Sequence, residues 1–179
     1  MADTILTLEA SSPKELQNIL AAKFSATKPA SRSINLIING PQVLTRLFQF
    51  EPVSDKELKR RLLHEAVELL SLPVSEIDLN FQILNFSPTK ISGIYVCIPK
   101  KIIKNYLWVL FQAKLYPVQI IPYAAACLNS FLKESQSGQE KKCFLNFMKE
   151  KIIYLVILSR KDCEWIREIP YEKIGRAHV

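Results

Sequence analysis

Hydrophobic positions along the chain follow two periods, one typical of helices and one typical of strands. Apolar residues recur every three or four positions in three segments, which predicts helices at about 13–25, from Ser54 to Pro73, and from Pro99 to just before Pro117. The small and apolar segment "YAAACLNSFL" is predicted to be a fourth helix.

Serines stand in the N-cap positions of the first two helices. Ser12 precedes the first helix, and Ser54 with Glu57 forms the S-x-x-E pattern of a capping box. The second helix carries one apolar stripe, made of Leu58, Leu62, Ala66, Leu69 and Leu70. The residues of the third helix that are predicted to face inward are Ile103, Tyr106, Leu107, Leu110 and Phe111.

Strands are predicted where apolar residues alternate with polar ones or form short runs between turn residues. These segments are "SINLIING", "VLTRLFQFEP", "EIDLNFQILNF", "IYVCIP", "PVQIIP", "CFLNFM", "IIYLVILS" and "CEWIREIP". The first is expected to be mostly buried and to end in the turn Asn39-Gly40-Pro41. "EIDLNFQILNF" and "IYVCIP" are expected to form an antiparallel hairpin across the turn "SPTKISG".

The resulting order of elements is α-β-β-α-β-β-α-β-α-β-β-β. This order predicts an α/β (mixed α+β) fold with a mixed sheet. No helix follows the last three strands, and an open sheet edge of this kind is what we expect if the gene has been cut short.

The last seven residues, 173–179, have the sequence that a common sequencing adapter encodes when it is translated, "KIGRAHV". We expect them to be adapter read-through, with the genuine sequence ending near Glu172.

Composition is that of an ordinary globular domain. Of the 179 residues, 49% are hydrophobic and 23% are charged, which excludes a disordered chain, a collagen and a coiled coil. No apolar run approaches the roughly 18 residues that suggest a membrane span, and the first residues lack the pattern of a signal peptide. The four cysteines are far apart, so free thiols in a reducing compartment are expected.

No pattern of residues identifies a catalytic, cofactor-binding or metal-binding site, and each is predicted to be absent. His64 stands beside Glu65 and Glu68, away from the apolar stripe of its helix, and is expected to be solvated. The glycines are too widely scattered for either nucleotide-binding loop pattern.

Two basic clusters raise the question of nucleic-acid binding. They consist of Lys56, Lys59, Arg60 and Arg61 in the second helix and of Lys100, Lys101 and Lys104 in the third. Acidic neighbours dilute the first cluster, and Tyr106, Trp108 and Phe111 are mainly at core spacing. A solvated helix face is therefore favoured, and no nucleic-acid partner is expected.

Phenylalanines gather on the predicted strands. Phe48 and Phe50 share one strand face with Arg46, and Phe81 and Phe86 belong to the strand after the second helix. The first interpretation is a hydrophobic core, and the alternative is a groove that accepts a peptide from a partner. The candidate partner-binding residues of that groove are Arg46, Phe48, Phe50 and Phe81.

The order and pattern of three segments resemble a known family. The segments are "KELKRRLLHEAVELLSLPVSEIDLNFQIL", "GIYVCIPKKIIKNYLWVLFQAKLYPVQIIPYAAACLNSFL" and "YLVILSRKDCEWIREIP". Over roughly residues 13–172 the chain resembles the PilM-type pilus assembly proteins of bacteria, cytoplasmic actin-like proteins related to the cell-division protein FtsA.

The resemblance implies a fragment of an actin-like (ribonuclease H-like) ATPase fold with a small inserted strand-helix-strand-strand subdomain. It places a partial first lobe at 1–42, the subdomain at 43–98 and a return to the lobe at 99–172. It also implies capture of the cytoplasmic tail of a PilN-type inner-membrane protein, with self-association left open. The protein would then be cytoplasmic and held at the inner face of the inner membrane through that partner alone.

The phosphate loops of the family are not matched. An Asp-Ile-Gly-type loop opens the final hairpin of family members, whereas this chain has "CFLNFMKEKIIYLVIL", without Asp or Gly, and the first loop is missing ahead of the first helix. Lys149 and Lys151 could meet a phosphate only as point charges. We therefore expect a degenerate, truncated and non-hydrolysing relative without a cofactor, although ATP with Mg²⁺ would belong to full-length members.

Two functions remain in competition on this basis. The first is a non-catalytic cytoplasmic scaffold of a type IV pilus or type II secretion assembly platform that binds the tail of a membrane partner. The alternative is an ATP-binding actin-like ATPase of pilus assembly or cell division whose nucleotide loops are lost by truncation. A nucleic-acid binder is favoured by the net charge alone.

Overall fold

The computed structural model describes residues 10, 12–24, 32–134, 141–148, 152–159 and 162–170. Its elements follow the predicted order, with one short 3-10 helix, η1 (Val74–Glu76), added after the second helix. The chain divides into two compact units, referred to below as unit 1 (Met1–Leu36 and Lys101–Ile120) and unit 2 (Ile37–Lys100 and Ile121–Val179).

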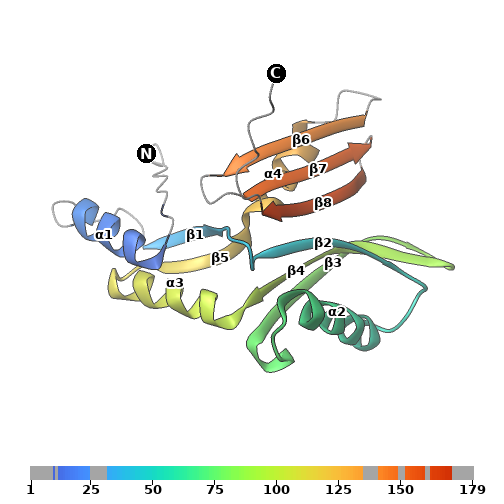
Figure 1. Ribbon diagram of the computed structural model, residues 1–179, viewed down its shortest axis with the longest axis horizontal. Helices are drawn as coiled ribbons and strands as arrows, with labels where there is room; N and C mark the ends of the chain where they lie inside the picture. Colours follow the sequence, from blue (N-terminus) through green and yellow to red (C-terminus); the bar gives the residue numbers. More distant parts are fainter. Residues whose placement is uncertain are drawn as a thin grey trace, which may run out of the picture. The chain divides into compact units, whose positions relative to one another are not determined.

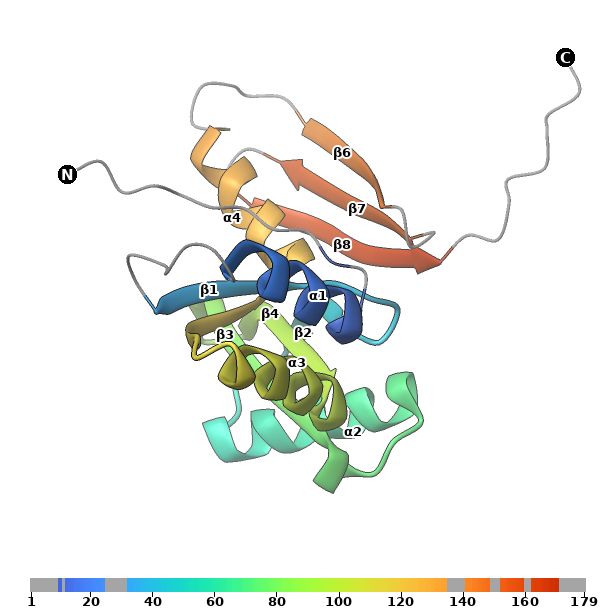
Figure 2. The same ribbon diagram turned by 90° about the vertical axis from the view of Figure 1, so that its left-hand side faces the viewer.

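Unit 1 is built from two helices and a two-stranded sheet (Figure 1). The elements are α1 (Pro13–Phe24), α3 (Lys100–Gln112), β1 (Ser33–Ile38) and β5 (Tyr116–Pro122). The first residue of α3 and the ends of β1 and β5 belong to unit 2. The N–H of Tyr116 donates to the carbonyl of Arg32 at 2.8 Å, so β1 and β5 begin at the same end of the sheet. Figure 2 shows α1 and α3 next to each other.

Hydrogen bonds at the helix ends of unit 1 explain where the helices begin and stop. The N–H of Glu15 donates to the Oγ of Ser12 at 3.2 Å, which confirms the predicted N-cap of α1. After α3, the N–H of Leu115 donates to the carbonyl of Leu110, and the N–H of Lys114 donates to that of Phe111, each at 2.9 Å. This is a Schellman motif in which Lys114, with a φ of 57°, takes the left-handed position that glycine usually fills.

Unit 2 contains a three-stranded antiparallel sheet covered by one helix. Its strand order is β2-β4-β3, with β2 (Leu44–Phe50), β4 (Lys90–Pro99) and β3 (Ile77–Ser87), and α2 (Asp55–Leu70) packs on one face. The core between them includes Leu58, Leu62, Ala66 and Leu70 from the helix. The pairing of β3 with β4 shifts between Ile83 and Asn85, so Leu84 is an extra, bulged residue.

The predicted capping box of α2 forms only in part. The N–H of Glu57 donates to the Oγ of Ser54 at 3.3 Å, as the sequence predicts. The Glu57 carboxylate instead accepts hydrogen bonds from Arg60 and Arg61. The helix ends at Leu70 because Ser71 adopts a left-handed conformation, two residues before Pro73.

A second antiparallel sheet of unit 2 has the order β6-β7-β8. Its strands are β6 (Lys141–Met148), β7 (Ile152–Ser159) and β8 (Asp162–Pro170), and α4 (Tyr123–Glu134) precedes them in the chain. The backbone of β8 approaches both β2 and α4. The sequence therefore predicts the strands correctly, but they are distributed over three sheets among the described residues and not over one mixed sheet.

Several predicted details are wrong for reasons of packing. Leu69 is 46% exposed, because the row that packs on the sheet follows every fourth residue of α2 and Leu69 lies beside it. Phe111 and Trp108 are exposed although helical spacing suggested a core position. In β1 exposed and half-buried residues alternate and only Ile38 is buried, and β4 starts at Lys90, inside the segment expected to be a turn.

Candidate partner-binding site

The four predicted partner-binding residues meet on the sheet of unit 2. Arg46, Phe48 and Phe50 alternate along β2, which places them on one face of the strand. Arg46 and Phe81 both stand opposite Tyr95 in the neighbouring strand β4. This face of the sheet is the one that α2 covers, since Phe48 and Tyr95 belong to the core shared with that helix.

The three phenylalanine rings form a small cluster. Phe48 stacks on Phe50 with ring centroids 6.0 Å apart and an interplanar angle of 23°, and meets Phe81 edge-on at 6.4 Å and 84°. Phe48 is only 5% exposed, whereas Phe50 and Phe81 are half-buried. Phe48 therefore belongs to the core in this structure, and the rings that a partner can reach are those of Phe50 and Phe81.

Gly93 accounts for the position of the Phe48 ring. It lies opposite Phe48 in the register of β2 and β4. A Cβ at this position would stand 2.7 Å from a carbon of the Phe48 ring and would collide with the carbonyl oxygen of Gln82. The ring can lie over the strand only because residue 93 has no side chain.

Arg46 lies in the buried part of the site. Its side chain is buried, and its Nη1 donates to the carbonyl of Thr45 at 2.7 Å. Opposite it, burial raises the pKa of Tyr95 well above its usual value, the Glu65 carboxylate raises it further, and the cationic Arg46 opposes that rise. Arg46 is therefore positioned as part of a buried polar group and not as an open surface charge.

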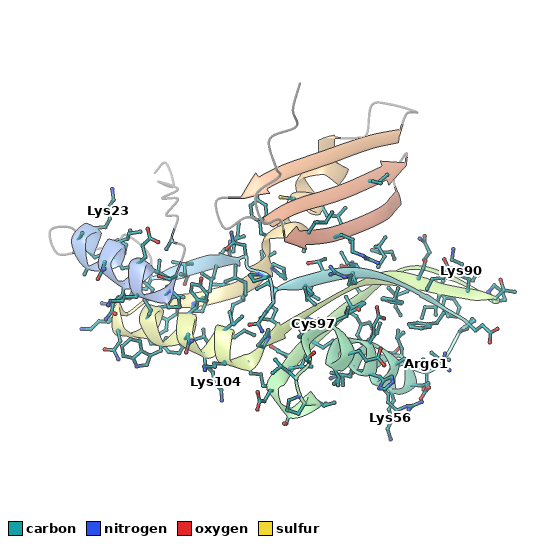
Figure 3. The ribbon with its side chains drawn as sticks, viewed as in Figure 1. Lys23, Lys56, Arg61, Lys90, Cys97 and Lys104 are labelled. Atoms are coloured by element: carbon teal, nitrogen blue, oxygen red, sulfur yellow. The ribbon has the colours of Figure 1, made fainter. Side chains whose placement is uncertain are left out.

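A hollow of about 630 Å³ lies against α2 and forms the accessible part of the site. Apolar side chains that line it include Phe50, Leu63, Val67 and Val74. The guanidinium of Arg61 lies 5.7 Å from the centre of the Phe50 ring, within the range of a cation–π contact. Figure 3 shows Arg61 on α2.

Sequence reasoning missed most of this lining. Leu63 and Val67 lie outside the apolar stripe of α2, and Val74 follows the helix, so none belonged to a single periodic pattern. The available signal was the presence of apolar residues on a second side of an otherwise charged helix.

The charges around the hollow are largely paired. Glu57 lies 2.8 Å from Arg60 and 2.9 Å from Arg61, and hydrogen bonds from these two residues lower the pKa of Glu57 to about 2. His64, predicted to be solvated, is exposed and lies 3.5 Å from Glu68. The basic cluster of α2 is therefore a helix face with internal ion pairs, as expected from its acidic neighbours.

The remaining predictions about chemistry concern metals, thiols and phosphate. Within the ranges described above, no three His, Cys, Asp or Glu side chains come together as metal ligands. Cys97 is buried in the core beneath α2, and burial raises the pKa of the Cys127 thiol. Lys149 and Lys151, the two point charges considered for phosphate, lie outside the described residues, as does the 173–179 tail. Among the helices that the structure describes, none is long and apolar enough to cross a membrane.

Solved structures similar to this chain share one fold. One is a PilM–PilN type IV pilus biogenesis complex, with a TM-score of 0.70 and 16% identity over 95% of this chain and 52% of that one. A Bacteroides thetaiotaomicron protein of actin-like ATPase fold and unknown function gives a TM-score of 0.57 and 13% identity over 96% and 59% of the two chains. The cytoplasmic domain of EpsL, an inner-membrane component of the Vibrio cholerae type II secretion system, gives a TM-score of 0.57 and 10% identity. The match covers 95% of this chain and 63% of that one.

These likenesses define the class of fold to which the chain belongs. The chain has the actin-like ATPase fold over the part that it spans, which is between about half and two thirds of the length of these solved structures. The fold class predicted from the sequence is thereby confirmed. No protein-family model and no curated protein matches the sequence.

Proposed function

We propose that the protein is a non-catalytic scaffold of a type IV pilus or type II secretion assembly platform, held at the inner membrane by the tail of a membrane partner. The observation that carries this proposal is the likeness to a PilM–PilN complex over 95% of the chain. The likeness to the EpsL cytoplasmic domain supports the same kind of platform and leaves the two machines as alternatives. The boundaries 1–42, 43–98 and 99–172 remain part of the proposal.

The partner tail is proposed to bind in the hollow against α2. An apolar lining that includes Phe50 and Val74 would hold the side chains of an extended peptide, and about 630 Å³ is within the usual range for a binding pocket. Phe50 would touch the peptide directly, and Phe81, which does not line the hollow, would hold the Phe48 ring edge-on. Phe48 would support Phe50 from the core, and Arg46 would supply a buried positive charge beneath them.

The test uses a fluorescein-labelled peptide with the sequence of the cytoplasmic tail of the PilN-type protein from the same organism. Fluorescence anisotropy should show saturable binding that weakens about tenfold or more for Phe50→Ala, because truncating an aromatic anchor removes a large part of the binding energy. Phe86→Ala is the matched control, since Phe86 is an exposed phenylalanine of the same sheet and does not line the hollow. Equal affinities of the native chain and Phe50→Ala would reject the site.

The actin-like fold supports a second candidate function, nucleotide binding. In that case ATP with Mg²⁺ would bind the full-length protein and raise its melting temperature by mass action. A titration calorimetry experiment with Mg-ATP that releases no heat, together with an unchanged melting temperature, would remove this candidate.

A further inference from the structure

Unit 1 carries a face on which aromatic and cationic side chains lie together outside its core. We call it the Trp108 face, and its residues are Lys101, Lys104, Trp108 and Phe111 from α3 and Tyr116 and Val118 from β5. The four residues of α3 recur every three or four positions and therefore lie on one side of the helix. On the opposite side Tyr106, Val109 and Leu110 are buried.

The aromatic part of this face is continuous from helix to strand. The rings of Phe111 and Tyr116 have centroids 6.1 Å apart. Trp108, Phe111, Tyr116 and Val118 are 51–68% exposed, which is unusual for four large apolar side chains side by side. Helix packing does not explain this exposure, because the inward side of α3 already supplies its own core.

The charged side chains of this face are all positive, and their position near the start of α3 destabilises the helix. Between Asp78 and Glu134 the sequence has six lysines and no acidic residue. The described residues of unit 1 carry six basic side chains and a single acidic one, Glu15. Lys101 and Lys104 stand near the N-terminus of α3, where the helix dipole disfavours positive charge. A face with charges of this one sign is complementary to an anionic ligand.

The shape of the face favours contact with a flat surface over the binding of a small molecule in a pocket. The hollow beside Trp108, lined by Pro13, Lys14 and Gln17 of α1, has a volume of about 190 Å³. This is below the roughly 300 Å³ at which ligand pockets begin. Figure 3 shows Lys104 pointing away from β1 and β5, as expected for a side chain that meets an external surface.

We propose that the Trp108 face docks unit 1 on the surface of an anionic lipid bilayer. Trp and Tyr rings are favoured at the level of the lipid headgroups, where their apolar bodies are buried and their polar edges stay hydrated. Lys101 and Lys104 bind the anionic headgroups beside them. This contact is independent of the partner tail and adds a weak second attachment to the membrane.

The test is co-sedimentation of the 179-residue chain with vesicles of phosphatidylcholine containing phosphatidylglycerol, compared with vesicles of phosphatidylcholine alone. Binding is expected only to the anionic vesicles and should fall as salt is raised. Lys101→Glu with Lys104→Glu should lower the partition coefficient at least tenfold, since each lysine near such a surface contributes about fivefold. Trp108→Ala with Phe111→Ala should lower it by a similar factor.

Matched controls come from unit 2. Lys56→Glu with Lys59→Glu makes the same change in net charge on α2, and Phe86→Ala removes a phenylalanine that is 70% exposed. Both should bind the anionic vesicles within about twofold of the native chain. Circular dichroism of each variant verifies folding, and in a Trp165→Phe background the emission of Trp108 should shift to the blue when vesicles are added.

Three results would overturn the proposal. The first is no binding to anionic vesicles at low salt, and the second is an equal loss of binding in the control variants. The third is a Trp108-dependent interaction with single-stranded DNA, or with a second copy of the chain in sedimentation velocity, while vesicles do not bind. Because the vesicles contain no protein, failure here leaves the proposed capture of a partner tail untouched.

Discussion

Gly93 shows how one residue without a side chain determines the packing of its neighbours. We expect Gly93→Ala to destabilise the protein by about 3 kcal/mol, because the new methyl group must displace both the Phe48 ring and the strand backbone at Gln82. Urea unfolding measures the change. Phe86→Ala, on the same sheet, should change the free energy of unfolding by less than about 0.5 kcal/mol. A loss below about 1 kcal/mol in Gly93→Ala would mean that the ring is not held over this strand.

At Lys114 we predict a substitution that increases the stability of the protein. Lys114→Gly should raise the free energy of unfolding by roughly 0.5 kcal/mol, because glycine adopts the left-handed conformation of the Schellman motif without strain. The greater flexibility of glycine in the unfolded chain offsets part of this gain. Lys114→Ala removes the charge and keeps the strain, so it serves as the control and should not stabilise. If both variants shifted the melting temperature equally, charge and not conformation would be the cause.

At the level of single residues, the sequence gives some information about the side of a helix or strand on which a residue lies. It gives less information about which residues a neighbouring element covers. Helical spacing placed Phe111 in the core, but the inward side of α3 is formed by Tyr106, Val109 and Leu110. Conversely, Phe48 was a candidate for an open groove and is buried under α2. For Phe48 periodicity gives the correct face of the strand, and the covering helix decides its burial, whereas in α3 it assigns Phe111 to the wrong side of the helix.

The start of α2 depends on charge as well as on its cap. Arg60 and Arg61 hold the pKa of Glu57 at about 2, below its ordinary value of 4.5. A lowered pKa means that the ionised Glu57 stabilises the folded state above about pH 4.5 and that this stabilisation is lost as the pH falls toward 2. The effect is small, because the carboxylate is solvent-exposed.

A carboxyl-detected NMR titration of Glu57 checks this expectation. In Arg60→Gln with Arg61→Gln the pKa should return toward 4.5, since the hydrogen bonds that lower it are gone. Lys59→Gln is the control, because Lys59 is a neighbouring cation that does not bond to Glu57 and its loss should move the titration little. An unchanged midpoint in the double variant would show that the ion pairs do not persist in solution.

Element order was predictable because each helix and strand has a local signal. Ser12 and Ser54 define the helix starts, and the alternation from Ile77 onward defines β3. The partition into three sheets was not predictable, because pairing of β1 with β5 joins residues some eighty positions apart and leaves no local mark. The candidate site was predictable only in part, again because its parts are far apart in the sequence. The sequence of β2 indicates Phe50, but the hollow beside Phe50 forms only when α2 packs next to it.

At the level of the whole molecule, the two proposed contacts belong to different compact units. The hollow is lined by residues of unit 2, and the Trp108 face belongs to unit 1. We therefore expect their effects to be independent, since sites that share no residue or partner usually contribute additively. Phe50→Ala should leave vesicle binding unchanged, and Trp108→Ala should leave the affinity for the tail peptide unchanged. A change of more than about threefold in either cross-measurement would show that the two units are coupled.

The bulge at Leu84 has a consequence for solubility. β3 is an edge strand of its sheet, and its outer half exposes Ile83, Leu84 and Phe86. A regular edge of this kind offers evenly spaced N–H and C=O groups to the strand of another chain, which is how fibres begin. The extra residue interrupts that spacing and twists the strand, so a second molecule cannot continue the ladder in register. We therefore expect one inserted leucine to disfavour aggregation along this long apolar edge.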